Sequence, residues 1–175
     1  KTVYPICTGI YIGGGSGSTT NIYYNSVNMS SSFWGNGQAT PFYDLAIGGS
    51  NPIVNIKNNI LFFNLPSMTN GYDACLGLGY STFTNLTSDY NNFSVAGSSG
   101  SIKSYAYTGS LIAGSGSSIT TLASWRSTSG KDANSTDGAP TFTSSTNLLP
   151  TNVSNNTTLL AQKGTPISSV TNDIV

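Results

Sequence analysis

Short segments of alternating polar and apolar residues recur along the first hundred residues of the chain. Three of them share one pattern at a spacing of 33 residues, namely Tyr24–Met29, Lys57–Phe62 and Tyr90–Val95. Each has Asn, then Asn or Ser, then two apolar residues separated by one variable position. Apolar side chains two residues apart lie on the same face of a β-strand, and Asn favours tight corners. The pattern therefore predicts a corner followed by a short strand, repeated three times.

Another short strand is predicted just before each corner, over Thr20–Tyr23, Pro52–Ile56 and Ser81–Leu86. The stretches Ser30–Pro41 and Leu65–Tyr80 are rich in Gly, Ser, Asn and Pro, which is typical of loops. Repeats of this length without helical periodicity favour β-structure over ankyrin or tetratricopeptide repeats. The sequence thus predicts an all-β protein, a parallel β-helix of about five coils with a period of about 33 residues.

Stacked coils would bring equivalent residues into vertical columns about 4.8 Å apart. In this alignment the inward columns are Val27, Ile60 and Phe93, and Met29, Phe62 and Val95. A ladder of asparagine side chains is predicted at the corner, made by Asn25, Asn58 and Asn91. Such a ladder is structural, because each amide bonds the next one.

After Val95 the pattern becomes looser. Alternation continues in Ile102–Tyr107, which is a predicted strand, and a helix is credible only within Ser118–Arg126. There Thr120 or Thr121 would cap the helix, and Leu122 and Trp125 would cover one face. We therefore expect three parts: a strand with a Gly/Ser tether over 1–19, β-helix coils over 20–145 and a polar C-terminal segment over 146–175.

Composition excludes several classes of function. Only 7% of the residues are charged, the net charge is zero, and the chain has neither His nor Glu. The lack of His excludes a Ser-His-Asp triad and a His-bearing zinc site, and a neutral chain is a poor partner for nucleic acid. No apolar run is long enough to span a membrane. We expect an extracellular or cell-surface protein without a metal or cofactor.

Two further features bear on an extracellular location. Cys7 and Cys75 can form one disulfide that closes a long loop, or they are two buried free thiols. Seven sequons make candidate glycosylation sites in a secreted protein, at Asn28, Asn85, Asn92, Asn134, Asn152, Asn155 and Asn156. Many such sequons arise by chance in a chain rich in Asn, Ser and Thr. The cluster at 152–158 is predicted to be the most exposed.

The segment Val54–Asn64 resembles a coil phrase of right-handed parallel β-helix (pectin-lyase-like) proteins. A later run resembles the closing coils of large secreted bacterial surface proteins with this fold; it contains Leu122, Trp125, Gly130, Asp132, Ser135, Pro140 and Phe142. The resemblance covers roughly residues 20–145 and implies a right-handed β-helix in a surface protein or adhesin. Relatives of this kind usually continue beyond such a phrase, whereas this sequence stops at Val175.

Many parallel β-helices cleave polysaccharides, but the fold alone does not establish an activity. Glycosidases need a pair of carboxylates. In this alignment Asp89 would lie opposite Ile56 and Tyr23, so the predicted coils bring no second carboxylate beside it. Asp132 and Asp137 are interpreted as turn formers. A polysaccharide lyase is therefore less favoured than a non-catalytic role.

Two non-catalytic functions remain. The first is a structural subunit of an extracellular fibre or adhesin stalk, assembled head-to-tail by strand addition through Lys1–Ile12, although these residues can equally be the first coil of this chain. The second is a carbohydrate-binding module of a larger surface protein. It would use aromatic side chains crowded in the first third: Tyr23, Tyr24, Phe33, Trp34, Phe42 and Tyr43. Such crowding is also typical of a core.

Overall fold

The computed structural model describes residues 6–30, 41–65, 72–97 and 102–170. The chain is mostly β-structure with parallel sheets, which confirms the all-β prediction at that level. The strands are β1 (Cys7–Ile12), β2 (Thr19–Tyr23), β3 (Ser26–Met29), β4 (Pro41–Ile47), β5 (Ile53–Lys57), β6 (Ile60–Leu65), β7 (Tyr72–Leu78), β8 (Leu86–Asp89), β9 (Asn92–Gly97), β10 (Ile102–Thr108), β11 (Ser117–Ile119) and β12 (Thr136–Asp137). The helices are α1 (Leu122–Ser129) and α2 (Ser154–Leu159).

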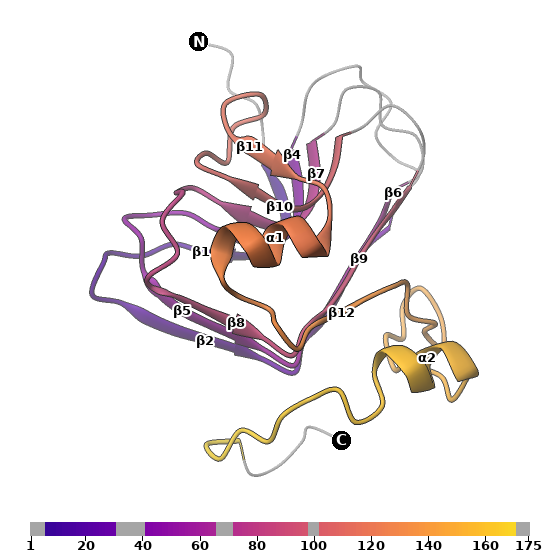
Figure 1. Ribbon diagram of the computed structural model, residues 1–175. Helices are drawn as coiled ribbons and strands as arrows, with labels where there is room; N and C mark the ends of the chain where they lie inside the picture. The colour runs from indigo at the N-terminus through magenta and orange to yellow at the C-terminus, as the bar shows by residue number, and fades with distance from the viewer. Residues whose placement is uncertain (1–5, 31–40, 66–71, 98–101, 171–175) are drawn as a thin grey trace.

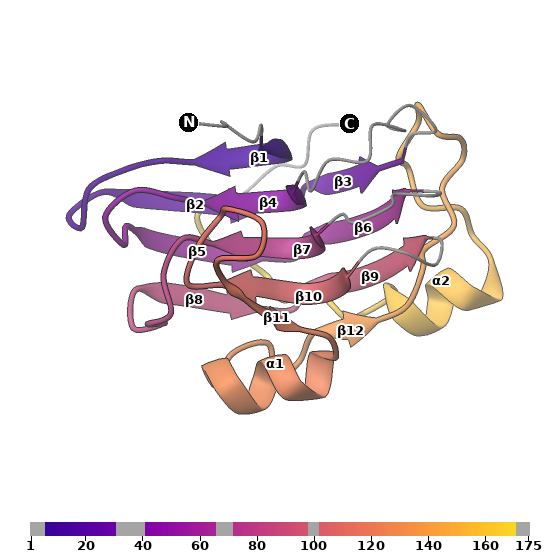
Figure 2. The same cartoon turned by 90° about the horizontal axis from the view of Figure 1, so that it is seen from above.

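The chain visits three sheets in turn and then returns to the first (Figure 1). The first sheet has the order β1-β4-β7-β10-β11, the second β2-β5-β8, and the third β12-β9-β6-β3. Every pairing is parallel except that of β10 with β11. We call each triplet of consecutive strands a rung, so that β1–β3, β4–β6 and β7–β9 form three successive rungs, and Figure 2 shows them stacked edge to edge. Strands β10 and β12 begin a fourth rung, and the predicted total of five coils stays a prediction.

The register of the third sheet differs by one residue from the predicted columns. Val27 lies opposite Leu61, which lies opposite Phe93, and Met29 likewise aligns with Phe63 and Val95. The predicted positions of Ile60 and Phe62 in these columns are therefore wrong. The observed spacing is 34 residues from the first rung to the second and 32 residues from the second to the third. It varies because the connecting loops differ in length, whereas the pairing of the strands keeps the buried side chains aligned.

Strand β7 lies within the stretch that the sequence pattern assigned to a loop. Its residues from Asp73 to Leu78 are all buried, as is the whole of β4 beside it. The segment after β10 covers the outer face of this sheet, where the Tyr43 hydroxyl donates to the carbonyl of Leu111. A strand buried on both faces has no polar alternation, so its pattern cannot be told from that of an irregular segment.

The N-terminal strand belongs to the fold. Strand β1 pairs with β4 from Cys7 to Ile12, as the reading of this segment as a first coil requires. The glycine-rich segment that follows also packs on the next rung, since the Ser50 N–H donates to the carbonyl of Gly14 at 2.9 Å. A Cβ atom on Gly49 would lie 2.2 Å from that same oxygen, and its φ of +73° also favours glycine.

Helix α1 seals one end of the stack (Figure 2). It begins as predicted, with the Thr121 Oγ1 accepting a hydrogen bond from the Ser124 N–H at 3.0 Å, and Leu122 and Trp125 are its buried residues. Gly130, with φ of +68°, ends the helix and donates its N–H to the carbonyl of Arg126. The helix packs on β10 and β11, so its apolar side chains close the interior at the C-terminal end.

The C-terminal segment lies outside the third sheet, where α2 follows a hairpin-like turn (Figure 1). Within the described ranges, neither helix is long and apolar enough to cross a lipid bilayer.

Candidate functional site

The corner between the second and third sheets is the most regular feature of the molecule. Tyr24, Asn58 and Tyr90 occupy equivalent positions there with φ of +56°, +59° and +59°. This left-handed conformation turns the chain from one sheet into the next, and a non-glycine residue adopts it only where its surroundings hold it. Each turn is followed directly by an asparagine whose side chain bonds the neighbouring rung.

These asparagines form the observed ladder of Asn25, Asn59 and Asn91. The Asn59 Oδ1 accepts from the backbone N–H and the amide of Asn25, at 3.0 and 3.1 Å. The Asn91 Oδ1 does the same for Asn59, at 3.0 and 3.1 Å. Asn59 and Asn91 are buried, and their amides also donate to backbone carbonyls. The ladder therefore satisfies the polar groups of the corner and leaves little for a ligand.

The predicted ladder position of Asn58 is wrong, and the reason is the register shift described above. Asn58 is the residue in the left-handed turn, and its side chain points away from the ladder. Its Nδ2 donates to the carbonyl of Thr165 at 2.7 Å, and its Oδ1 accepts from the Thr165 N–H at 2.8 Å. A second contact holds the same residue, because the Tyr24 hydroxyl also donates to the Thr165 carbonyl. Asn58 thus fixes the C-terminal segment to the corner.

At the sealed end Asp132 and Ser135 terminate the ladder. Asp132 is buried in a left-handed turn with φ of +57°, and its Oδ1 accepts from the Asn91 amide and the Ser135 hydroxyl. Its Oδ2 accepts from the indole N–H of Trp125 at 2.7 Å. The Ser135 hydroxyl in turn accepts from the Asn91 N–H. Asp132 is therefore a turn former, as predicted, and also joins the ladder to α1.

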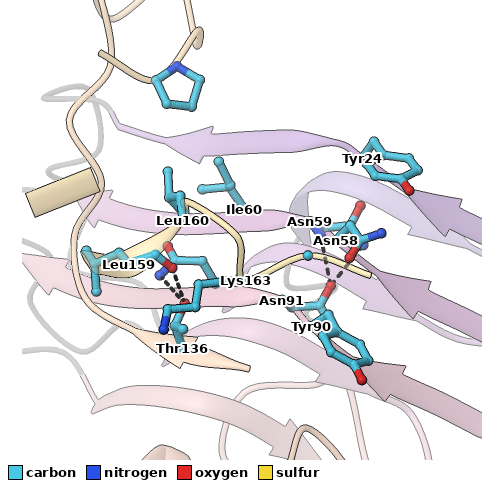
Figure 3. A pocket seen from close by; sticks show the side chains of 13 residues that line it. Tyr24, Asn58, Asn59, Ile60, Tyr90, Asn91, Thr136, Leu159, Leu160 and Lys163 are labelled. Atoms are coloured by element: carbon cyan, nitrogen blue, oxygen red, sulfur yellow. Dashed lines mark hydrogen bonds between the residues drawn. The ribbon is translucent and has the colours of Figure 1, made fainter. Parts of the chain in front are cut away.

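A cavity of about 210 Å³ lies between the corner and the C-terminal segment (Figure 3). Ile60, Leu159 and Leu160 lie together on one side of it, while Tyr24 and Tyr90 lie on the other side with Asn58 between them. Lys163 is the one charged residue in its lining among the described residues. The volume is of the order that holds a single ring-sized molecule.

Asp44 is a fully buried acid inside the stack, on β4 next to Cys75 on β7. Neither of its carboxyl oxygens accepts a hydrogen bond of normal geometry within the described residues. Burial raises the pKa of Asp44 well above its usual value; the nearby Cys75 thiol and Met29 backbone partly oppose this rise, and the Asp73 carboxyl adds to it. Burial therefore favours the neutral form of this carboxyl group in the folded protein.

Replacement of Asp44 by asparagine tests this state. The unfolded chain ionises Asp44 above pH of about 4, whereas the folded chain keeps the proton until the raised pKa is reached. Wild-type stability should consequently fall as pH rises through this window, because the unfolded chain releases a proton that the folded chain retains. Asp44→Asn should lack that slope, and urea unfolding of both proteins at several pH values measures it. A stability difference between them that does not change with pH would contradict the neutral form.

The disulfide prediction is wrong, since Cys7 and Cys75 are free. They lie on β1 and β7, which are separated by β4, and so by about 9–10 Å. This exceeds the Cα separation that a disulfide spans. The Cys75 sulfur instead lies 3.5 Å from the carbonyl oxygens of Leu61 and Ser94, and burial raises the pKa of its thiol well above the usual value. The alternative of two buried free thiols holds in full for Cys75 and in part for Cys7, which is free but only partly buried.

The seven sequons differ in accessibility. Asn92 and Asn156 are buried, and the Asn156 amide donates to the carbonyls of Thr141 and Thr151. Asn28 and Asn85 are partly buried. Asn134, Asn152 and Asn155 are exposed, but the amides of Asn134 and Asn155 donate to Asp89 and to the Ala139 carbonyl. The 152–158 cluster is thus exposed at two of its three sequon asparagines, and glycosylation itself stays a prediction.

Other residues singled out in the sequence have separate places. Asp89 lies opposite Lys57 and Tyr23, one residue from the predicted alignment with Ile56, and Phe42 and Tyr43 are buried. Tyr24 is 46% exposed, while Phe33 and Trp34 lie outside the described residues. Sequence reasoning missed the buried Asp44, for which the uniformly apolar neighbours on β4 were the available signal. Within the described ranges no three His, Cys, Asp or Glu side chains are grouped closely enough to hold a metal ion.

Comparison with known proteins identifies no relative: no family model, no curated protein and no solved structure matches this chain.

Proposed function

We propose that the chain is a short right-handed parallel β-helix that acts as a non-catalytic structural unit of an extracellular fibre or cell-surface adhesin. Three parallel sheets visited in strict rotation, with an asparagine ladder in register at one corner, support this architecture. The low content of charged residues supports an inert, hydrated surface outside the cell. Hydrogen bonds between rungs and a continuous apolar interior suit a load-bearing stalk.

The observation that carries the proposal is the difference between the two ends of the stack. At the C-terminal end, Trp125 is fully buried and α1 covers the interior. At the N-terminal end, β1, β2 and β3 are each the last strand of their sheets among the described residues. A stack with one sealed and one open end is the geometry of a terminal unit, to which further rungs can be added on one side only.

This asymmetry changes how assembly would occur. Head-to-tail strand addition would require the open end of one copy to pair with the sealed end of the next. There α1 and the antiparallel β11 cover the interior and the edge of β10. An extended head-to-tail filament would therefore need α1 to be displaced, and we favour a unit that ends a stalk over one that repeats along it.

A carbohydrate-binding module is the second candidate, favoured by the cavity at the corner. Tyr24 and Tyr90 are two rungs apart, roughly 10 Å, and flank Asn58 beside an apolar cavity of ring size. Aromatic faces and amides together are suited to sugar rings. Against this candidate, Thr165 already occupies the hydrogen-bonding groups of Asn58.

Imaging of the native material tests the first proposal, and glycan binding tests the second. A stalk unit should be found within elongated particles by negative-stain electron microscopy, and it should not be retained on immobilised glycans. Single compact particles of 18.1 kDa in the native material would overturn the structural role. Glycan retention that is lost in Tyr90→Ala, but kept in the exposed helix variant Ser127→Ala, would instead establish the binding module.

A further inference from the structure

The open end of the stack leaves apolar interior side chains partly exposed. Four inward residues of the first rung are only half-buried, whereas the residues opposite them in the second rung are fully buried; Ile12, at the end of β1, is itself buried. The half-buried residues are Ile10, Ile22, Val27 and Met29, and their fully buried partners are Leu45, Ile56, Leu61 and Phe63. The difference arises because each second-rung residue is covered on both sides by neighbouring rungs and each first-rung residue on one side (Figure 2). This end of the core therefore favours a further layer of apolar side chains.

The described strands at this end, β1, β2 and β3, carry no charged side chain. The sequence contains no Asp, Glu, Lys or Arg from Thr2 to Tyr43, which includes all of β1, β2 and β3. Edge strands that must stay unpaired are usually protected by charged side chains, by proline or by a covering segment. Within Cys7–Met29, the part of the first rung that the structure describes, none of these strands contains a charged residue or a proline. An uncharged edge above a partly exposed apolar interior is typical of an interface.

The sealed end determines which contact is possible between two copies. Because α1 covers the interior at that end, the open end of one copy meets an uncovered edge of the apolar interior at the open end of another. Such a contact uses the same surface on both copies and is related by a two-fold axis, so it closes at two chains. The strands of the two edges would then run antiparallel, which is compatible with backbone pairing.

We propose that this chain on its own associates open end to open end into a symmetric dimer, with β1, β2 and β3 of both copies at the interface. The inference rests on the terminal-unit geometry proposed above, and it names a second copy as the occupant of the open end. An uncharged surface places no like charges opposite each other across the two-fold axis. In a longer chain, additional rungs would occupy the same edge and replace the dimer.

Sedimentation equilibrium of the full 175-residue chain tests the proposal. The expected mass is twice 18.1 kDa and should be constant over a wide range of concentration. Ile22→Lys places a charge in the interface and should shift the protein to the mass of one chain. Ser127→Lys adds the same charge to an exposed position on α1, at the opposite end of the stack, and should leave the dimer intact. Val27→Lys serves in place of Ile22→Lys if circular dichroism shows that the latter has lost its fold.

Each other outcome overturns the dimer. A wild-type monomer means that the open end is stable without a partner, and a mass that keeps growing with concentration means an open-ended contact. Equal dissociation by Ser127→Lys and Ile22→Lys would place the contact elsewhere. None of these outcomes removes the stalk proposal, because that is tested by imaging the native material and not by the mass of the isolated chain.

Discussion

Replacement of Asn59 by alanine should destabilise the protein by roughly 3 kcal/mol or more, because several buried groups lose their partners at once. The Asn59 side chain accepts two hydrogen bonds from Asn25 and donates to the carbonyls of Ile22 and Lys57 and to Asn91. Alanine can replace none of these contacts, and water has little access to the buried corner. Urea unfolding followed by circular dichroism gives the loss in the free energy of unfolding.

Asn58→Gly is the matched control, one residue away. Glycine adopts the φ of +59° without strain, and the lost bonds to Thr165 lie at the partly buried surface. The change in stability should therefore stay within about 1 kcal/mol. The opposite ranking, with Asn58→Gly the more damaging variant, would mean that the uniform 33-residue alignment places the ladder correctly and that the observed register is wrong.

Truncation of Trp125 to alanine should destabilise the protein by about 3–5 kcal/mol, the range found for large aromatic residues in cores. Trp125 is fully buried, packs edge-on against Phe83 at a centroid distance of 5.3 Å, and donates its indole N–H to Asp132. Its removal opens a cavity at the sealed end and leaves a buried carboxylate oxygen without that donor. The same unfolding experiment measures the loss, and amide exchange should accelerate first in β10 and β11, on which α1 packs.

Two variants separate the contributions of Trp125. Trp125→Phe keeps an aromatic ring but not the N–H, so its loss should be smaller, about 1–3 kcal/mol. Ser127→Ala lies on the exposed side of the same helix and should be close to neutral. If Trp125→Ala were as stable as Ser127→Ala, α1 would not be an end cap, and the difference between the two ends would lose its basis.

The sequence predicted elements whose signal is local. The apolar pairs after each corner predicted β3, β6 and β9, and Thr121 with Leu122 and Trp125 predicted α1 within a few residues. Local periodicity was sufficient for the strands, and a capping residue with two apolar side chains was sufficient for the helix. The asparagine ladder was also expected, with two of its three members correctly identified, namely Asn25 and Asn91.

Features that depend on neighbours in space were missed or misplaced. Strand β7 carries no alternation, because the first sheet is buried on both faces. Gly77 in this strand lies under the ring of Tyr43, where a Cβ atom would come within 2.7 Å of the ring, so its role depends on a residue 34 positions earlier. The neutral state of Asp44 likewise depends on burial among residues from several strands. Pattern alone cannot supply these relations.

By itself, the sequence determined that the chain forms short strands joined by asparagine-bearing corners, and that a short helix lies near Ser118–Arg126, whereas α2 was not predicted. It also determined that histidine-dependent chemistry is absent, since composition needs no fold to be read. Tertiary structure alone decided that Asn59 and not Asn58 lies in the ladder, that the cysteines stay apart, and that one end of the stack is sealed. The reason is that register follows from the pairing of strands and the burial of side chains, and loops of unequal length hide it from any fixed spacing along the chain.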